Sequence, residues 1–221
     1  NAISSGDVNN VLIGENAGLS INAGEGNAII GFSAGDALTS GDLNTAIGYF
    51  ALSTSTDVDR VVAIGTEAME AGNVTSAADG TVAIGSKALQ VLTSGAANVA
   101  IGKDSGKALT TGAHNTFLGT TTGDDMVEGS YNIAIGSDAL GGAKDGTADA
   151  SQFNIFMGVN SGNGAWVTAV SQYNIGIGHY TLDGAMNGAI HNTGVGHQAL
   201  SAITTGDYNT GLGFRAGMAI T

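Results

Sequence analysis

Asn-Val-Ala-Ile-Gly at 98–102 recurs as Asn-Thr-Phe-Leu-Gly at 115–119 and as Asn-Ile-Ala-Ile-Gly at 132–136. Variants of this string occur twelve times in the 221 residues, and seven of the eleven intervals between their glycines are 17 residues long. The other intervals are 18, 20, 20 and 22 residues, so every departure from the period is an insertion. A fixed period of this kind predicts a solenoid, in which each repeat forms one coil that stacks on the next.

The glycine that ends each string is taken as position 0 of its repeat. The twelve anchor glycines are Gly14, Gly31, Gly48, Gly65, Gly85, Gly102, Gly119, Gly136, Gly158, Gly178, Gly196 and Gly213. Position −1 is large and apolar in every copy, position −3 is mostly Val, Ile or Thr, and position −2 is often Ala or Gly. Position −4 is asparagine in ten copies, with Val61 and Thr81 in the other two: Asn10, Asn27, Asn44, Asn98, Asn115, Asn132, Asn154, Asn174, Asn192 and Asn209.

These positions predict a five-residue strand that ends at the anchor glycine. Position +3 is always Ala, Ser or Thr and position +7 is often large, which favours a tight corner followed by a second short strand. Asparagine and glycine then form the return corner. Seventeen residues are too few for a β–α–β unit, whose crossover alone needs about a dozen residues. We therefore expect an all-β parallel β-solenoid of twelve coils, with residues 1–221 forming a single array within a longer fibrous protein.

The predicted strand carries apolar or small side chains on both faces. Because side chains alternate along a strand, positions −3 and −1 share one face and position −2 lies on the other. A single solenoid needs only one buried face. We expect the face with Ala and Gly at position −2 to lie against neighbouring copies of the chain.

Net charge and apolar patterning exclude several kinds of partner. Nineteen acidic residues oppose six basic ones, giving a net charge of −13. Nucleic acids and anionic membranes both need a positive surface, so we expect neither as a partner. The chain has no run of 18 apolar residues, so we expect no membrane insertion.

Candidate catalytic and metal-binding residues are sparse. His114 and His191 occupy position −5, as do Tyr131, Phe153, Tyr173 and Tyr208, which indicates a repeat position filled by flat side chains. His179 and His197 follow anchor glycines, and the sequence offers no third ligand for zinc beside them. No pair of carboxylates recurs at a fixed position, as a glycosidase would need. We expect no catalytic residue, no cofactor and no metal.

The only tryptophan, Trp166, lies in an insertion at about 161–172. Two interpretations remain open for it. An exposed indole there would be a contact for a glycan, whereas a buried one would indicate that the loop packs against its neighbour.

Asn-Val-Ala-Ile-Gly (98–102), Thr-Val-Ala-Ile-Gly (81–85) and Asn-Ile-Ala-Ile-Gly (132–136) resemble the head repeat of the trimeric autotransporter adhesins, the YadA-like family. The 17-residue version, with Thr-Thr-Gly before the next asparagine, is similar to repeats of phage tail-fibre proteins. The resemblance implies a left-handed parallel β-roll that assembles as a homotrimer.

For function, the resemblance implies an extracellular structural segment of a phage tail fibre or a similar cell-surface appendage. Such a segment would act as a rigid spacer with a role in host attachment, through a glycan or a protein of the host surface. The alternative is the head domain of a bacterial trimeric autotransporter adhesin, which would bind host or surface ligands.

Overall fold

The computed structural model describes residues 9–142, 150–166 and 169–220, and the chain divides into two compact units, 1–111 and 112–221. Apart from one 3-10 turn, η1 (Ser76–Ala78), the regular structure of the described residues consists of twelve three-residue strands. The first unit holds β1 (Val11–Ile13), β2 (Ala28–Ile30), β3 (Thr45–Ile47), β4 (Val62–Ile64), β5 (Val82–Ile84) and β6 (Val99–Ile101). The second unit holds β7 (Thr116–Leu118), β8 (Ile133–Ile135), β9 (Ile155–Met157), β10 (Ile175–Ile177), β11 (Thr193–Val195) and β12 (Thr210–Leu212).

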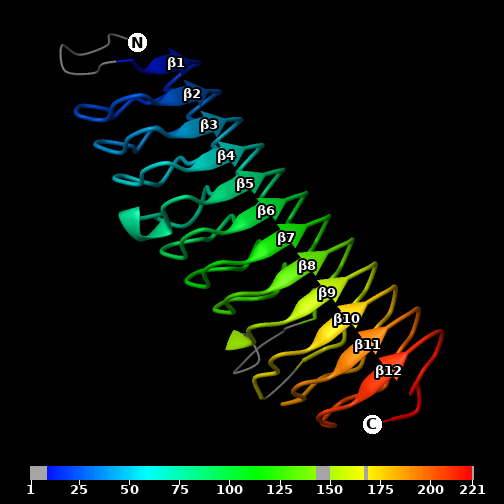
Figure 1. The fold of residues 1–221 in the computed structure, drawn as a ribbon. Helices are drawn as coiled ribbons and strands as arrows, with labels where there is room; N and C mark the ends of the chain where they lie inside the picture. The colour runs from blue at the N-terminus through cyan, green and yellow to red at the C-terminus, as the bar shows by residue number, and fades with distance from the viewer. Residues whose placement is uncertain (1–8, 143–149, 167–168, 221) are drawn as a thin grey trace. The chain divides into compact units, whose positions relative to one another are not determined.

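Within each unit, every strand pairs in parallel with the next strand along the chain. The register equals one repeat, so that Ala46 lies opposite Ala63 and Gly194 opposite Gly211. The insertion of the longest interval leaves the register intact, because Ile135 still pairs with Met157. Figure 1 shows the strands of each unit stacked in chain order, with the longer loops extending from the coils. The predicted all-β parallel β-solenoid is therefore confirmed.

The return segment of the coil differs from the expectation of a second strand. Residues at positions +2 and +4 have positive φ in all twelve coils, as in Phe50 (54°) and Leu52 (56°). Inter-coil backbone bonds still form there, since the Leu52 N–H donates to the Ala68 carbonyl at 3.0 Å. The predicted five-residue strand is only three residues long, because the anchor glycine, with φ between 118° and 142°, already leaves the extended conformation. The prediction of a second strand is wrong, because the left-handed residues at positions +2 and +4 turn the chain repeatedly while their amide groups stay paired.

The anchor glycines meet two requirements that other residues would not. Their φ values lie between 118° and 142°, a region that L side chains rarely adopt. A Cβ atom at Gly31 would lie 2.2 Å from the carbonyl oxygen of Gly48 in the next coil, and one at Gly48 would lie 2.3 Å from that of Gly65. Glycine at position 0 therefore lets neighbouring coils approach to the spacing of paired strands.

The two faces of the strand are reversed from the expectation. Position −2 points into the coil, where Ala46, Ala63 and Phe156 are fully buried. Positions −3 and −1 point outward and are partly or largely exposed in every strand. The interior is narrow, so each strand contributes one side chain to it and the remainder comes from the return segment, including Leu38 and Leu92 at position +7.

Positions −2 and +4 of the same coil compensate each other in size in ten of the twelve coils. A large residue at −2 faces glycine at +4 in four coils: Leu12 and Gly18, Ile29 and Gly35, Phe117 and Gly123, Phe156 and Gly162. A small residue at −2 is combined with Leu or Met at +4 in six: Ala46 and Leu52, Ala63 and Met69, Ala83 and Leu89, Ala134 and Leu140, Gly176 and Leu182, Gly194 and Leu200. A Cβ at Gly35 would lie 2.9 Å from Cδ1 of Ile29. In the four coils with a large residue at −2, the two positions therefore share one space.

Candidate functional site

The asparagines at position −4 form a hydrogen-bonded ladder within each unit. The Oδ1 of Asn27 accepts a bond from the backbone N–H of Asn44 at 2.9 Å, and its Nδ2 donates to the carbonyl of Gly41 at 2.8 Å. The same two bonds recur in the second unit, where Asn192 bonds the N–H of Asn209 at 3.0 Å and the carbonyl of Gly206 at 2.7 Å. Each amide thus connects two coils and satisfies backbone groups of the return corner.

The two repeats without asparagine keep part of this pattern. Thr81 uses its hydroxyl, which donates to the Gly95 carbonyl at 3.3 Å and accepts from the Asn98 N–H at 3.4 Å. Val61 offers no side-chain partner, although its own N–H donates to Oδ1 of Asn44 at 3.1 Å. These contacts assign the asparagine position to coil stacking.

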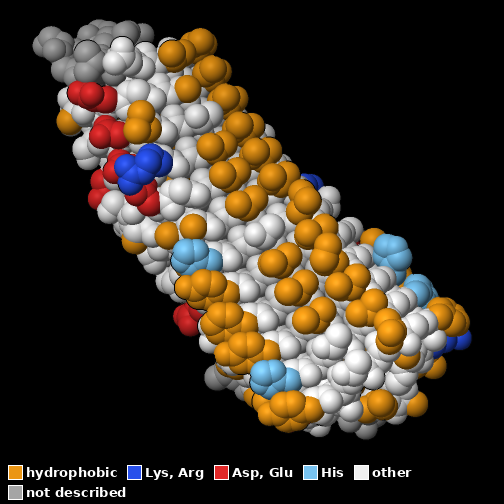
Figure 2. Space-filling model, viewed as in Figure 1, with side chains coloured by type: hydrophobic (Ala, Val, Ile, Leu, Met, Phe, Trp, Pro, Cys, Tyr) orange, Lys and Arg blue, Asp and Glu red, His pale blue; other side chains and the backbone are white. Residues whose placement is uncertain are grey.

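The outward strand face forms an apolar stripe on each unit. Leu118, Ile133, Met157 and Ile177 are 37–43% exposed, and Ile13 is 57% exposed. Figure 2 shows hydrophobic side chains following one another from strand to strand down the stack of each unit. These large residues point away from the core. In the single chain they are therefore accessible to a partner.

Position −5 of the second unit carries an unbroken stack of six rings, called here the aromatic ladder: His114, Tyr131, Phe153, Tyr173, His191 and Tyr208. Successive ring centroids lie 4.8, 5.1, 5.1, 4.9 and 5.2 Å apart, with interplanar angles between 1° and 12°. All six residues are exposed and all have positive φ. Figure 2 shows a row of histidine and hydrophobic side chains along one edge of the second unit.

The sequence indicates that position −5 is filled by flat side chains, but no binding function was predicted for it. The signal for the ladder was the uninterrupted run of rings in six successive repeats. In the first unit the same position holds Asn9, Gly26, Leu43, Arg60, Gly80 and Ala97, so no ladder forms there.

Trp166 does not offer the surface that a glycan contact would need. Its side chain is fully buried, and its ring lies 5.7 Å from that of Phe156 in an edge-on arrangement. Its backbone N–H donates to the carbonyl of Gly142, one coil away, at 2.8 Å. The exposed-indole interpretation is therefore wrong, and the indole packs against its neighbours in the coil interior.

The remaining histidines take part in local contacts. Nδ1 of His179 accepts a bond from the N–H of Val159 at 2.9 Å, and the ring of His197 stacks on Phe214 with centroids 5.6 Å apart. Within residues 9–142, 150–166 and 169–220, no group of three His, Cys, Asp or Glu residues is arranged to hold a metal ion.

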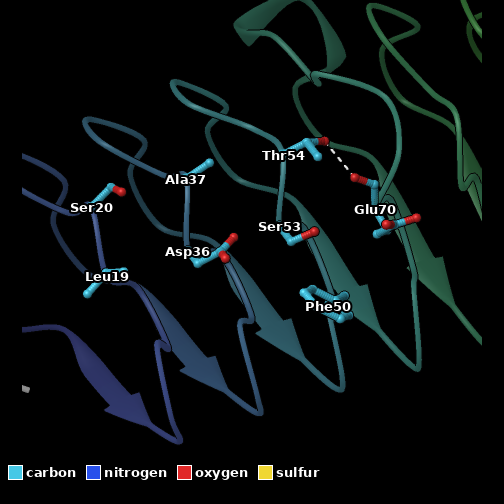
Figure 3. Close-up of a pocket in the computed structure, with 8 residues that line it drawn as sticks. All are labelled: Leu19, Ser20, Asp36, Ala37, Phe50, Ser53, Thr54 and Glu70. Atoms are coloured by element: carbon cyan, nitrogen blue, oxygen red, sulfur yellow. Dashed lines mark hydrogen bonds between the residues drawn. The ribbon is translucent and has the colours of Figure 1, made fainter.

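A shallow depression of about 630 Å³ lies on the return segments of the first unit (Figure 3). Four successive coils line it with Leu19, Ser20, Asp36, Ala37, Phe50, Ser53, Thr54 and Glu70. Burial raises the pKa of Asp36, against a hydrogen bond from Ser33 that lowers it. The hydroxyl of Thr54 is already used, because its single O–H is within hydrogen-bonding distance of the backbone carbonyls of Glu70 and Gly72.

One carboxyl group of the second unit has a strongly altered acidity. Burial raises the pKa of Asp183 to about 6, although a hydrogen bond from the backbone N–H of Asn163 opposes this shift. Asp183 lies at position +5, on the return segment, whereas the residues of the aromatic ladder lie at position −5.

In the part of the chain that the structure describes, no helix has the length and apolar character needed to cross a membrane. The chain matches no family model, no curated protein and no solved structure with which it was compared.

Proposed function

We propose that this chain is a structural segment of an extracellular fibre, of the kind found in phage tail fibres. It assembles as a homotrimer, serves as a rigid spacer and takes part in host attachment. The observation that carries this proposal is the outward apolar stripe of the strands.

An apolar stripe of this kind favours association with a partner of equal period. Contiguous exposed apolar patches above a few hundred Å² mark interaction sites on soluble proteins. A second copy of the chain presents Ile, Val and Leu rows with the same coil spacing, so its side chains fit between those of the first copy along the whole stripe. Association also removes side chains such as Ile133 and Ile177 from water.

The way the coils are built supports the spacer role. Each coil bonds to its neighbours through strand pairs, asparagine amides and return-segment bonds. Solenoid coils contact only their neighbours, so repeats can be added without redesigning a core. The recurring positions of the repeat serve this stacking, which supports a structural, non-enzymatic role.

Light scattering on the purified chain tests the assembly. We expect a mass about three times the 21.7 kDa of one chain. The double variant Ile133→Asp, Ile177→Asp places charges on the stripe and should give a monomer. Leu19→Asp, at an exposed apolar residue of the return segment, is the matched control and should leave the mass unchanged. A stable monomer of the unaltered chain would refute the proposal.

A further inference from the structure

We propose that the aromatic ladder of the second unit binds an extended, neutral β-1,4-linked glycan, which lies along the ladder with one sugar per coil. This inference rests on the attachment role proposed above and specifies its site and ligand class. It concerns His114, Tyr131, Phe153, Tyr173, His191 and Tyr208.

The first argument is the spacing of the rings. Their centroids repeat every 4.8–5.2 Å. A sugar in an extended β-1,4-linked chain advances by nearly the same distance, so rings and sugars stay aligned over six coils. An α-1,4-linked chain coils into a helix and would lose this alignment after a few sugars.

The second argument is the alternation of polar groups along the ladder. The tyrosines Tyr131, Tyr173 and Tyr208 occur at every second coil, with Phe153 and His191 between them. In an extended β-1,4-linked chain, successive sugars are rotated by half a turn, so every second sugar presents the same edge. The three phenol groups therefore meet equivalent sugar hydroxyls.

The third argument is which part of each ring is available. Because neighbouring rings are nearly parallel, with an interplanar angle of only 1° between Phe153 and Tyr173, they cover each other's faces. The ladder thus presents ring edges and phenol hydroxyls, and the phenol hydroxyls hydrogen-bond to the hydroxyl groups of a sugar. Nucleic acid bases instead stack on open aromatic faces beside positive charge.

Charge selects further among polymers. Residues 112–221 contain eight acidic and two basic residues, a net charge of −6. The ladder itself contains no carboxylate and no Lys or Arg. An anionic polysaccharide would be repelled by this unit, whereas a neutral one is not.

The ladder is also held in place before any ligand arrives. The Tyr131 N–H donates to the Ala113 carbonyl at 2.9 Å, and the Tyr208 N–H donates to the Ile190 carbonyl at 3.1 Å. These two bonds fix the corners at Tyr131 and Tyr208, and the stacked rings restrict one another. Groups ordered in advance lose less conformational entropy on binding, which favours affinity.

Isothermal titration calorimetry of the full chain with cellobiose, cellotetraose and cellohexaose tests the proposal. We expect the affinity to rise with each increase in length, because longer chains contact more coils. Maltohexaose should bind at least about tenfold more weakly than cellohexaose, equivalent to about 1.4 kcal/mol. Failure of cellohexaose to bind, or equal binding of maltohexaose, would overturn the inference.

The double variant Tyr131→Ala, Tyr173→Ala should reduce cellohexaose affinity by about tenfold or more. Ala97 occupies the same position with φ 54°, so alanine is compatible with this corner. Leu43→Ala, at the same position in the first unit, is the control and should bind like the parent.

Light scattering on the double variant separates this inference from the homotrimer. An unchanged mass with weakened binding supports the ladder as a glycan site. A loss of mass would show that the ladder is an interface between copies and would overturn the inference. Absence of glycan binding by an intact trimer would leave the assembly proposal standing.

Discussion

Asparagine at position −4 is suited to its place because one short side chain supplies both an acceptor and a donor. Asn27 uses both, toward the Asn44 N–H and the Gly41 carbonyl, and it is almost fully buried. Alanine supplies neither group. Aspartate supplies acceptors alone and would add a buried charge, which is costly without a partner. Thr81 illustrates an intermediate case, with bonds to equivalent partners at longer distances.

Asn27→Ala should therefore destabilise the fold by about 1–3 kcal/mol, since it leaves buried backbone groups without partners. Thermal unfolding followed by circular dichroism would measure this loss. Asn22→Ala is the matched control, because Asn22 is exposed and lies only five residues earlier in the chain; its effect should stay within about 0.5 kcal/mol. Equal melting of both variants would mean that position −4 merely tolerates asparagine.

Asp183 makes stability depend on pH. Burial raises its pKa to about 6 in the folded chain, from the ordinary aspartate value of 3.8. The folded state therefore holds the proton more tightly than the unfolded state, and the resulting stabilisation is complete below about pH 4. It is lost as the pH rises through 6.

Asp183→Asn should accordingly raise the melting temperature at pH 7 and change it little near pH 4. Glu128→Gln removes one charge at an exposed position of the same unit and serves as the control. A gain of the same size for both variants would attribute the effect to net charge rather than to burial of Asp183.

At the scale of the coil, the compensation between positions −2 and +4 makes a prediction about paired substitutions. Ile29→Ala should cost about 2–5 kcal/mol, because it removes a fully buried side chain. Gly35→Leu alone should cost about 1–3 kcal/mol by overpacking against Ile29. Together the two changes reproduce the combination of Ala46 with Leu52 found in the next coil.

The double variant should therefore recover at least half of the summed losses, as measured by denaturant unfolding. Leucine is compatible with the backbone at position +4, since Leu52 and Leu89 have φ of 56° and 48° there. Additive losses in the double variant would show that the two positions do not share one space.

The period, the strand position and the parallel register could be predicted from the sequence, because Gly48, Asn44 and Ile47 recur at fixed offsets. Which strand face is inside could not, since alternation distinguishes two faces without saying which is buried. The small residues at −2, such as Ala46, fit a narrow interior, while the large ones at −1 face outward. The left-handed conformation of the return segment was not predicted, because Phe50 and Leu52 give no sequence signal for positive φ.

The candidate sites, too, could be predicted from the sequence only in part. The aromatic ladder was visible as a shared position of His114, Tyr131 and Phe153, but its stacking and exposure depend on corner geometry. The burial of Trp166 depends on its contact with Phe156. The period places Phe156 in a strand, but it does not show that a residue from an insertion packs against it.

For the molecule as a whole, the dominant electrostatic feature is its excess of negative charge. Each chain carries −13, and in the proposed homotrimer three such chains lie side by side. Like charges repel and oppose the compact assembly, and salt weakens that repulsion. The Debye length falls from about 30 Å at 0.01 M to about 8 Å at 0.15 M ionic strength.

Added NaCl over this range should consequently raise the melting temperature of the assembly. If the stabilisation is screening alone, CaCl2 and MgCl2 at equal concentration should raise the melting temperature equally, because both cations carry the same charge.

A chelator should leave the melting curve unchanged, consistent with the expectation of no bound metal. A larger gain with Ca²⁺ than with Mg²⁺ would instead identify a site that selects for ion size and coordination. A chelator-induced drop in melting temperature would show that a bound metal ion stabilises the fold.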